Sequence, residues 1–202
     1  MSSNQIRNDS FRLSWEDLSD HITGYLIRIK HASDGKVILE EEIPIDQKSL
    51  KISGLLAASK YRVEIGSMRF NEISEMESSF VQTIPNAPKI SIQSITAKSA
   101  ILIIKGPMRG SSFVAVLTNG GTNVQKIRIN NRKSLTLTGL EPGSYYNLSI
   151  ATLFESQISD KTEETFLTIP DTLQQLRLVS QKKALQNKNL RKIKMISDRI
   201  NK

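Results

Sequence analysis

The sequence predicts an all-β chain in which two tandem seven-stranded β-sandwiches are followed by a C-terminal amphipathic α-helix. Three observations support this prediction. Apolar and polar residues alternate through most of residues 1–170, a segment recurs at an offset of 85 residues, and the composition changes at Pro170. Alternation with a period of two is typical of half-buried strands. We therefore expect one domain at residues 1–84, a second at 85–170 and a helix at 171–202.

The repeat is visible when the sequence is aligned with itself. At an offset of 85 residues, Lys48–Leu55 matches Lys133–Leu140, Tyr61 matches Tyr146, and Thr83-Ile84-Pro85 matches Thr168-Ile169-Pro170. A unit of this length is longer than the repeats of helical solenoids and suits a small independent domain. The sequence therefore predicts two copies of one fold.

Each copy contains a series of short segments in which every second residue is apolar. In the first copy these segments are Phe11–Trp15, Tyr25–Ile29, Val37–Leu39, Leu50–Ile52, Tyr61–Ile65 and Phe80–Ile84. In the second they are Ile90–Ile92, Ile101–Ile103, Phe113–Leu117, Ile127–Ile129, Leu135–Leu137, Tyr146–Ile150 and Phe166–Ile169. Turn-forming residues between them favour an antiparallel sandwich. Few residues precede Phe11, so we expect the first strand of copy one to be short or missing, which would leave an edge open to another chain.

Three features resemble the fibronectin type III domain, an immunoglobulin-like sandwich. They are Trp15, Tyr25 ten residues later, and the corner motif Gly139-Leu140-Glu141-Pro142-Gly143-Ser144-Tyr145-Tyr146. The resemblance covers about residues 5–170. Copy one lacks the Pro and Gly of the corner, and copy two lacks the tryptophan, for which we expect Ile103 to substitute.

The aromatic residues of this pattern have a structural interpretation. A tyrosine six residues after the leucine of the corner can bury its ring between the sheets while its hydroxyl bonds to backbone upstream. We therefore expect Tyr61 and Tyr146 to be structural, and we interpret Trp15, Tyr25 and Leu140 as core residues of the same kind.

Composition argues against catalysis. The chain has no cysteine and two histidines, and it lacks a phosphate-binding loop, a nucleophile elbow and a zinc-binding helix. We expect no catalytic residue, no metal site and no cofactor, and hence no enzyme. No apolar segment reaches the roughly 20 residues needed to cross a bilayer, and the acidic residues among the first 20 do not fit a signal peptide.

The basic charge is concentrated at the C-terminus. The chain has a formal net charge of +8, and residues 171–202 hold nine basic and two acidic side chains. Thr172 with Gln175 fits a capping box, which predicts that a helix starts there. The candidate residues for binding an anionic partner are Arg177, Lys182, Lys183, Lys188, Arg191, Lys192, Lys194 and Arg199.

Three interpretations of this helix remain open. It packs its apolar side on a sandwich or on a second copy of the helix, or it binds an acidic protein, heparin-like polysaccharide or anionic membrane. Nucleic acid is the least favoured partner, because the tail has no aromatic residue for base stacking.

Asn8 and Asn147 begin sequences that fit the N-glycosylation pattern. In copy two, Asn147 alternates with the apolar residues Tyr146 and Leu148, so we expect it to face outward.

The resemblance implies a non-catalytic spacer and protein-interaction module of a cell-surface receptor, adhesion protein or extracellular-matrix protein, located outside the cell. The alternative is an intracellular adaptor, cytoplasmic if Met1 is the natural start, whose basic helix docks on an acidic or membrane surface. Fold alone does not fix function, so both hypotheses rest on analogy.

Overall fold

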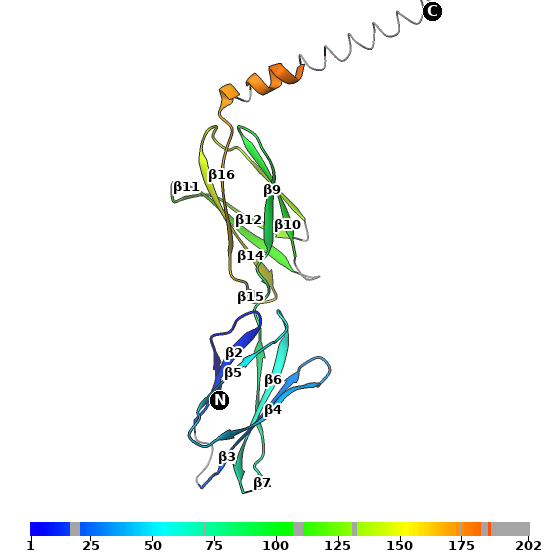
Figure 1. The fold of residues 1–202 in the computed structure, drawn as a ribbon, viewed down its shortest axis with the longest axis vertical. Helices are drawn as coiled ribbons and strands as arrows, with labels where there is room; N and C mark the ends of the chain where they lie inside the picture. The colour runs from blue at the N-terminus through cyan, green and yellow to red at the C-terminus, as the bar shows by residue number, and fades with distance from the viewer. Residues whose placement is uncertain are drawn as a thin grey trace, which may run out of the picture. The chain divides into compact units, whose positions relative to one another are not determined.

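The computed structural model describes residues 1–16, 21–70, 72–106, 111–130, 133–173, 175–182 and 186. Residues 1–88 form the body of one compact unit, and residues 89–105 with 115–149 form the body of another. The fold consists of two sandwiches and a short C-terminal helix (Figure 1). This all-β tandem architecture agrees with the sequence prediction.

The first sandwich has a three-stranded sheet and a five-stranded sheet. The smaller sheet has the order β1-β2-β5, with β1 at Ser2–Asn4, β2 at Ser10–Ser14 and β5 at Ser49–Ser53. The larger sheet runs β4-β3-β6-β7, with β8 also paired to β6. Its strands are β3 (Gly24–His31), β4 (Val37–Pro44), β6 (Lys60–Arg69), β7 (Glu72–Ile73) and β8 (Glu77–Gln82). The pairings recorded within this sandwich are antiparallel.

The second sandwich repeats this plan. Its three-stranded sheet has the order β13-β10-β9, and its five-stranded sheet runs β12-β11-β14-β15 with β16 also paired to β14. The strands are β9 (Lys89–Ile95), β10 (Ser99–Lys105), β11 (Ser112–Asn119), β12 (Thr122–Asn130), β13 (Ser134–Thr138), β14 (Tyr145–Phe154), β15 (Gln157–Ile158) and β16 (Thr162–Leu167).

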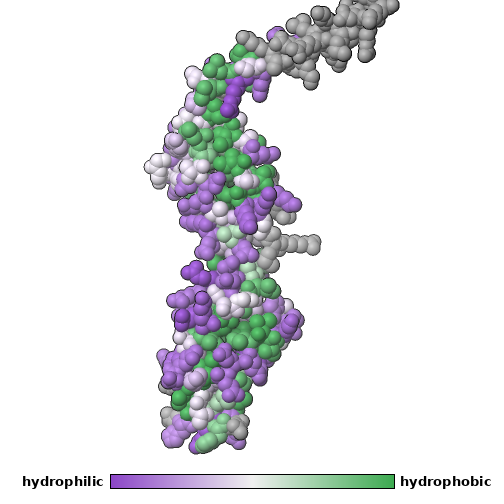
Figure 2. Space-filling view, in the orientation of Figure 1, coloured by the Kyte–Doolittle hydropathy of each residue, from purple (hydrophilic) through white to green (hydrophobic). Residues whose placement is uncertain are grey.

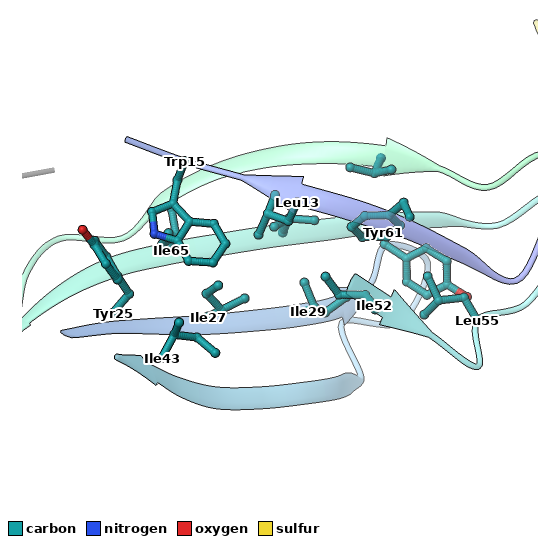
Figure 3. Packing of buried hydrophobic residues seen from close by; sticks show 13 residues of the cluster. Leu13, Trp15, Tyr25, Ile27, Ile29, Ile43, Ile52, Leu55, Tyr61 and Ile65 are labelled. Carbon is teal, nitrogen blue, oxygen red and sulfur yellow. The ribbon is translucent and has the colours of Figure 1, made fainter. Parts of the chain in front are cut away.

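The core of the first sandwich lies between its two sheets (Figure 3). Phe11 and Leu13 of β2 face Ile27 and Ile29 of β3, and all four are at most 1% exposed. Each fully buried aliphatic or aromatic side chain contributes about 1.5–3 kcal/mol. The alternation read in the sequence therefore places the apolar side of each strand in the core.

The first strand of copy one is present but short. Ser2, Ser3 and Asn4 of β1 pair with Ser14, Leu13 and Arg12 of β2. The sequence predicted a first strand that is short or missing. The structure has a three-residue strand there, which covers part of the edge of β2.

The residue that replaces the tryptophan in copy two is Ile104 and not Ile103. Ile104 is 2% exposed and its N–H bonds to the carbonyl of Lys133, as the N–H of Trp15 bonds to the carbonyl of Lys48. Ile103 is half-buried on the opposite face of β10. The prediction was wrong by one residue, and such a shift reverses the face of every side chain in a strand.

The last strand of copy one also differs by one position from the expected pattern. Val81 is 3% exposed, whereas Phe80 is 59% exposed. In copy two the core residue at the same repeat position is Phe166, at 4% exposure. The first sandwich therefore buries the smaller of two neighbouring apolar residues and presents the aromatic one to solvent.

The C-terminal helix begins at residue 171, one residue before the capping position expected at Thr172. Leu173, Leu176, Leu178 and Val179 are each at least 50% exposed. Apolar side chains also reach the surface of both sandwiches, where they form green areas in Figure 2. No helix within the described ranges is long and apolar enough to span a membrane.

Candidate functional site

The two corner tyrosines occupy equivalent positions in the two sandwiches. Tyr61 is 1% and Tyr146 is 2% exposed. The hydroxyl of Tyr61 accepts a hydrogen bond from the N–H of Leu56, and that of Tyr146 accepts one from the N–H of Glu141. Each hydroxyl thus holds the backbone five residues upstream, at the chain's crossing between the sheets.

A buried threonine completes each corner, and sequence analysis did not single it out. Thr83 and Thr168 are both 0% exposed. The hydroxyl of Thr83 donates to the carbonyl of Leu56 and accepts from the N–H of Ser59. The recurrence of Thr-Ile-Pro at the end of each copy was the signal that could have identified both threonines.

Thr168 makes the same pair of bonds in the second sandwich. Its hydroxyl donates to the carbonyl of Glu141 at 2.6 Å and accepts from the N–H of Ser144 at 2.9 Å. Buried backbone groups without partners are costly, so both corners use one tyrosine and one threonine to satisfy them.

The remaining predicted structural residues lie in the two cores. Trp15 packs edge-on against Tyr25 with 5.6 Å between ring centroids (Figure 3). Lys48 lies over the Tyr25 ring and donates a hydrogen bond to its hydroxyl. Leu140 is 3% exposed, and its N–H bonds to the carbonyl of Lys98. These contacts are those of core residues.

The outer face of the larger sheet of the first sandwich carries an ordered group of charges. The side chain of Glu64 on β6 is 7% exposed, although it lies on the face turned away from the core. Its carboxylate contacts Lys30 at 2.9 Å, Arg62 at 3.1 Å and Arg28 at 3.8 Å. We call Glu64, Arg28, Lys30 and Arg62 the Glu64 cluster.

Glu40 on β4 extends this cluster toward the edge of the sheet. It forms an ion pair with the guanidinium of Arg28. The hydrogen bond from Arg28 lowers the pKa of the Glu40 carboxyl from its ordinary value, and the same bond raises the pKa of Arg28. The guanidinium of Arg62 also donates to Ser78 on β8, so the charges cross the sheet from β4 to β8.

An aromatic side chain lies beside the cluster. Phe80 pairs with Arg62 across β8 and β6, and the ammonium of Lys60 lies 4.6 Å from the centre of its ring. Half-exposed aromatic and arginine side chains are the residue types enriched at the centres of protein interfaces. Phe80 and the Glu64 cluster therefore form the candidate interaction surface of the first sandwich, which we call the outer-face site.

The second sandwich serves as an internal control for this site. At the repeat offset, Arg62 corresponds to Asn147, Glu64 to Ser149 and Phe80 to Thr165. Since that sandwich forms the same sheet with uncharged residues at these positions, the fold does not require the cluster.

The predicted basic site of the tail is only partly described. Arg177 and Lys182 are exposed on the helix, near the exposed leucines. Lys183, Lys188, Arg191, Lys192, Lys194 and Arg199 lie outside the described residues. The described part of the helix thus carries two of the eight predicted basic residues.

The two predicted glycosylation positions are both half-buried. Asn147 lies on the outer side of β14, but it is half-buried and its Oδ1 atom is enclosed without a hydrogen-bond partner in the described part of the chain. Asn8 is also half-buried, and its Nδ2 atom donates to Asn86 at 2.8 Å. No group of His, Cys, Asp or Glu able to hold a metal occurs among the residues that the structure describes.

The family model of the fibronectin type III domain matches residues 1–83. A two-domain fibronectin type III segment of chicken tenascin has a similar structure, with a TM-score of 0.58, 24% identity, and coverage of 83% of this chain and 97% of that one. The chain has the fold of two fibronectin type III domains in tandem. In both of them the corner tyrosine and the closing threonine make the same hydrogen bonds.

Curated relatives of these fibronectin type III domains include mouse (Mus musculus) tenascin-N, 24% identical over 150 residues, which are 73% of this chain and 10% of the relative. Chicken (Gallus gallus) tenascin is 28% identical over 148 residues, 70% of this chain and 8% of the relative. The chain thus spans about a tenth of the length of these relatives.

Proposed function

We propose that the chain is a non-catalytic interaction and spacer module of an extracellular-matrix or adhesion protein, and that it binds a protein partner through the outer-face site. The similarity to tenascins supports the matrix setting. The observation that carries the proposal is the difference between the two sandwiches: one sheet face holds four ordered charges and an exposed Phe80 that the other sandwich lacks.

The arrangement suits a protein partner for two physical reasons. Glu64 holds three cations in fixed positions, so they lose little side-chain entropy when a partner binds. Phe80 offers apolar area that binding would bury beside them. Glu40 and Glu64 offset two of the three positive charges, which favours a mixed protein surface over a uniformly anionic polymer.

The test is fibroblast attachment to plates coated with the full chain. Phe80→Ala and Arg62→Ala are expected to reduce attachment at least fivefold, while the matched control Thr165→Ala in the second sandwich leaves it unchanged. Equal attachment to all four proteins contradicts the outer-face site, and no attachment to the unaltered chain contradicts the adhesion function.

A second candidate function follows from the tail. Leu173, Leu176 and Val179 lie on one side of the helix at intervals of three residues, all exposed, with Arg177 beside them. Apolar and basic residues combined in this way suit an anionic membrane or acidic surface, as the intracellular adaptor alternative requires. Arg177→Glu with Lys182→Glu would then abolish salt-sensitive retention on phosphatidylserine vesicles without changing cell attachment. Unchanged retention contradicts this alternative.

A further inference from the structure

β4 and β12 are equivalent strands, because each forms the outer edge of the five-stranded sheet of its own sandwich. Within the described part of the chain, β4 pairs with β3 alone and β12 with β11 alone. An unpaired strand edge presents N–H and C=O groups that another strand can bind. The chain therefore carries two free edges of similar length, at Val37–Pro44 and Thr122–Asn130.

The two edges have opposite charges although they occupy the same place in the fold. β4 carries Glu40, Glu41 and Glu42, all exposed, and contains no basic residue. β12 carries Lys126 and Arg128, both exposed, and contains no acidic residue. Like charges placed directly opposite one another destabilise a strand pair, so neither edge is suited to pair with its own kind.

One antiparallel register satisfies both strands. When Glu42 lies opposite Lys126, Glu40 lies opposite Arg128, which places unlike charges across from each other on the outer face. The same register sets the half-buried Leu39 opposite the buried Ile129 on the core side. In this register the core-facing residues of β4 and β12 lie on one side of the joined sheet and their outward-facing residues on the other, as cross-strand pairing requires.

We infer that β4 of one copy of this chain pairs with β12 of a second copy. Charge complementarity makes the β12 edge the partner of the β4 edge. Because the contact joins two different edges, it is heterologous and links copies head to tail in an open array or a ring. Pro44, which has no N–H, ends the pairing segment. Because the pairing is short and its charges are exposed, the contact is weak and sensitive to salt. The two proposals share Glu40, which also pairs with Arg28, but the strand pairing does not rest on the function proposed for the outer-face site.

The experiment is sedimentation velocity of the full chain from about 10 μM to 1 mM, at low salt and in 0.5 M NaCl. Two charge reversals test the contact: Glu41→Lys with Glu42→Lys on β4, and Lys126→Glu with Arg128→Glu on β12. Both leave Glu40 and its ion pair in place, and circular dichroism verifies that each variant is folded. Phe80→Ala serves as the control, since it alters the outer-face site and neither edge.

The expected result is association of the unaltered chain and of Phe80→Ala that rises with concentration and falls with salt. Each reversed variant alone is monomeric. An equimolar mixture of the two associates again, because the unaltered β12 of the first variant pairs with the unaltered β4 of the second. A monomeric unaltered chain at 1 mM overturns the inference. A reversed variant that still associates alone also overturns it, because that result is expected if the helix mediates association. A mixture that stays monomeric overturns it as well.

Discussion

The hydroxyl oxygen of Tyr61 lies 2.8 Å from the backbone nitrogen of Leu56, whose carbonyl in turn accepts a hydrogen bond from Thr83. Leu56 is therefore held through both of its peptide groups, by Tyr61 of β6 and by Thr83, which directly follows β8. The second sandwich repeats the arrangement at Glu141 with Tyr146 and Thr168. Both sandwiches thus fix the same corner by the same pair of hydroxyl groups.

Removing the tyrosine hydroxyl should destabilise its own sandwich. Tyr61→Phe leaves the N–H of Leu56 without its partner, at an expected cost of about 1–2 kcal/mol in the free energy of unfolding. Urea denaturation followed by circular dichroism measures the change. Tyr145→Phe is the control, because Tyr145 is 67% exposed, and it should change stability by less than about 0.5 kcal/mol. Equal effects of the two variants would contradict the role assigned to the corner.

The threonine should act together with the tyrosine. Thr83→Val keeps the shape of the side chain and removes two hydrogen bonds, with an expected loss of about 1–3 kcal/mol. Because Tyr61 and Thr83 both bond to Leu56, the double variant should lose measurably less or more than the sum of the single losses. Strict additivity in a double-mutant cycle would show that the two hydroxyls act separately.

The position of Ile104 in the second core leads to a comparison with its neighbour. Ile104→Val removes one buried methyl group and should cost about 0.5–1.5 kcal/mol. Ile103→Val makes the same chemical change at a half-buried position, so the cost should be smaller. Both variants keep a β-branched side chain, so strand propensity is matched. A larger loss at Ile103 in urea denaturation would contradict the observed register.

The ion pair of Arg28 and Glu40 predicts a pH dependence. Hydrogen bonding to Arg28 lowers the pKa of Glu40 below its ordinary value of 4.5. The pair therefore stabilises the fold above that pH, and the contribution is lost as pH falls through the lowered pKa. In Arg28→Gln, carbon-detected NMR titration should find the pKa of Glu40 shifted back up. Arg62 contacts Glu64, so Arg62→Gln should leave the pKa of Glu40 unchanged. An unshifted pKa of Glu40 in Arg28→Gln would show that Arg28 is not what lowers it.

Most of the fold follows from the sequence because alternation, turns and the repeat all indicate the same strands. The failures occur where neighbouring residues are all apolar. In Ile101–Ile104 and at Phe80-Val81, every residue is suited to a core, so alternation cannot tell which side faces inward. Only the partner strands settle the question, as the bond from Ile104 to Lys133 shows.

The outer-face site was beyond sequence reasoning for a different reason. Arg28, Lys30, Arg62 and Glu64 come from two strands, and each alone is an ordinary polar residue on the outer side of its strand. Their convergence depends on the β3–β6 register, in which Arg28 lies opposite Glu64. The three consecutive glutamates of β4 are evident in the sequence. Their opposite charge to that of β12 suggests strand pairing only once the topology shows that both strands are edge strands.

Trp15 gives the molecule a built-in optical label. It is the only tryptophan in the chain, it is 5% exposed, and it lies in the core of the first sandwich. Fluorescence excited at about 295 nm therefore reports on one sandwich, while the second contributes no indole emission. Loss of the blue-shifted emission of a buried indole marks the opening of that core, so the unfolding of the two sandwiches can be separated in the intact chain without any added dye.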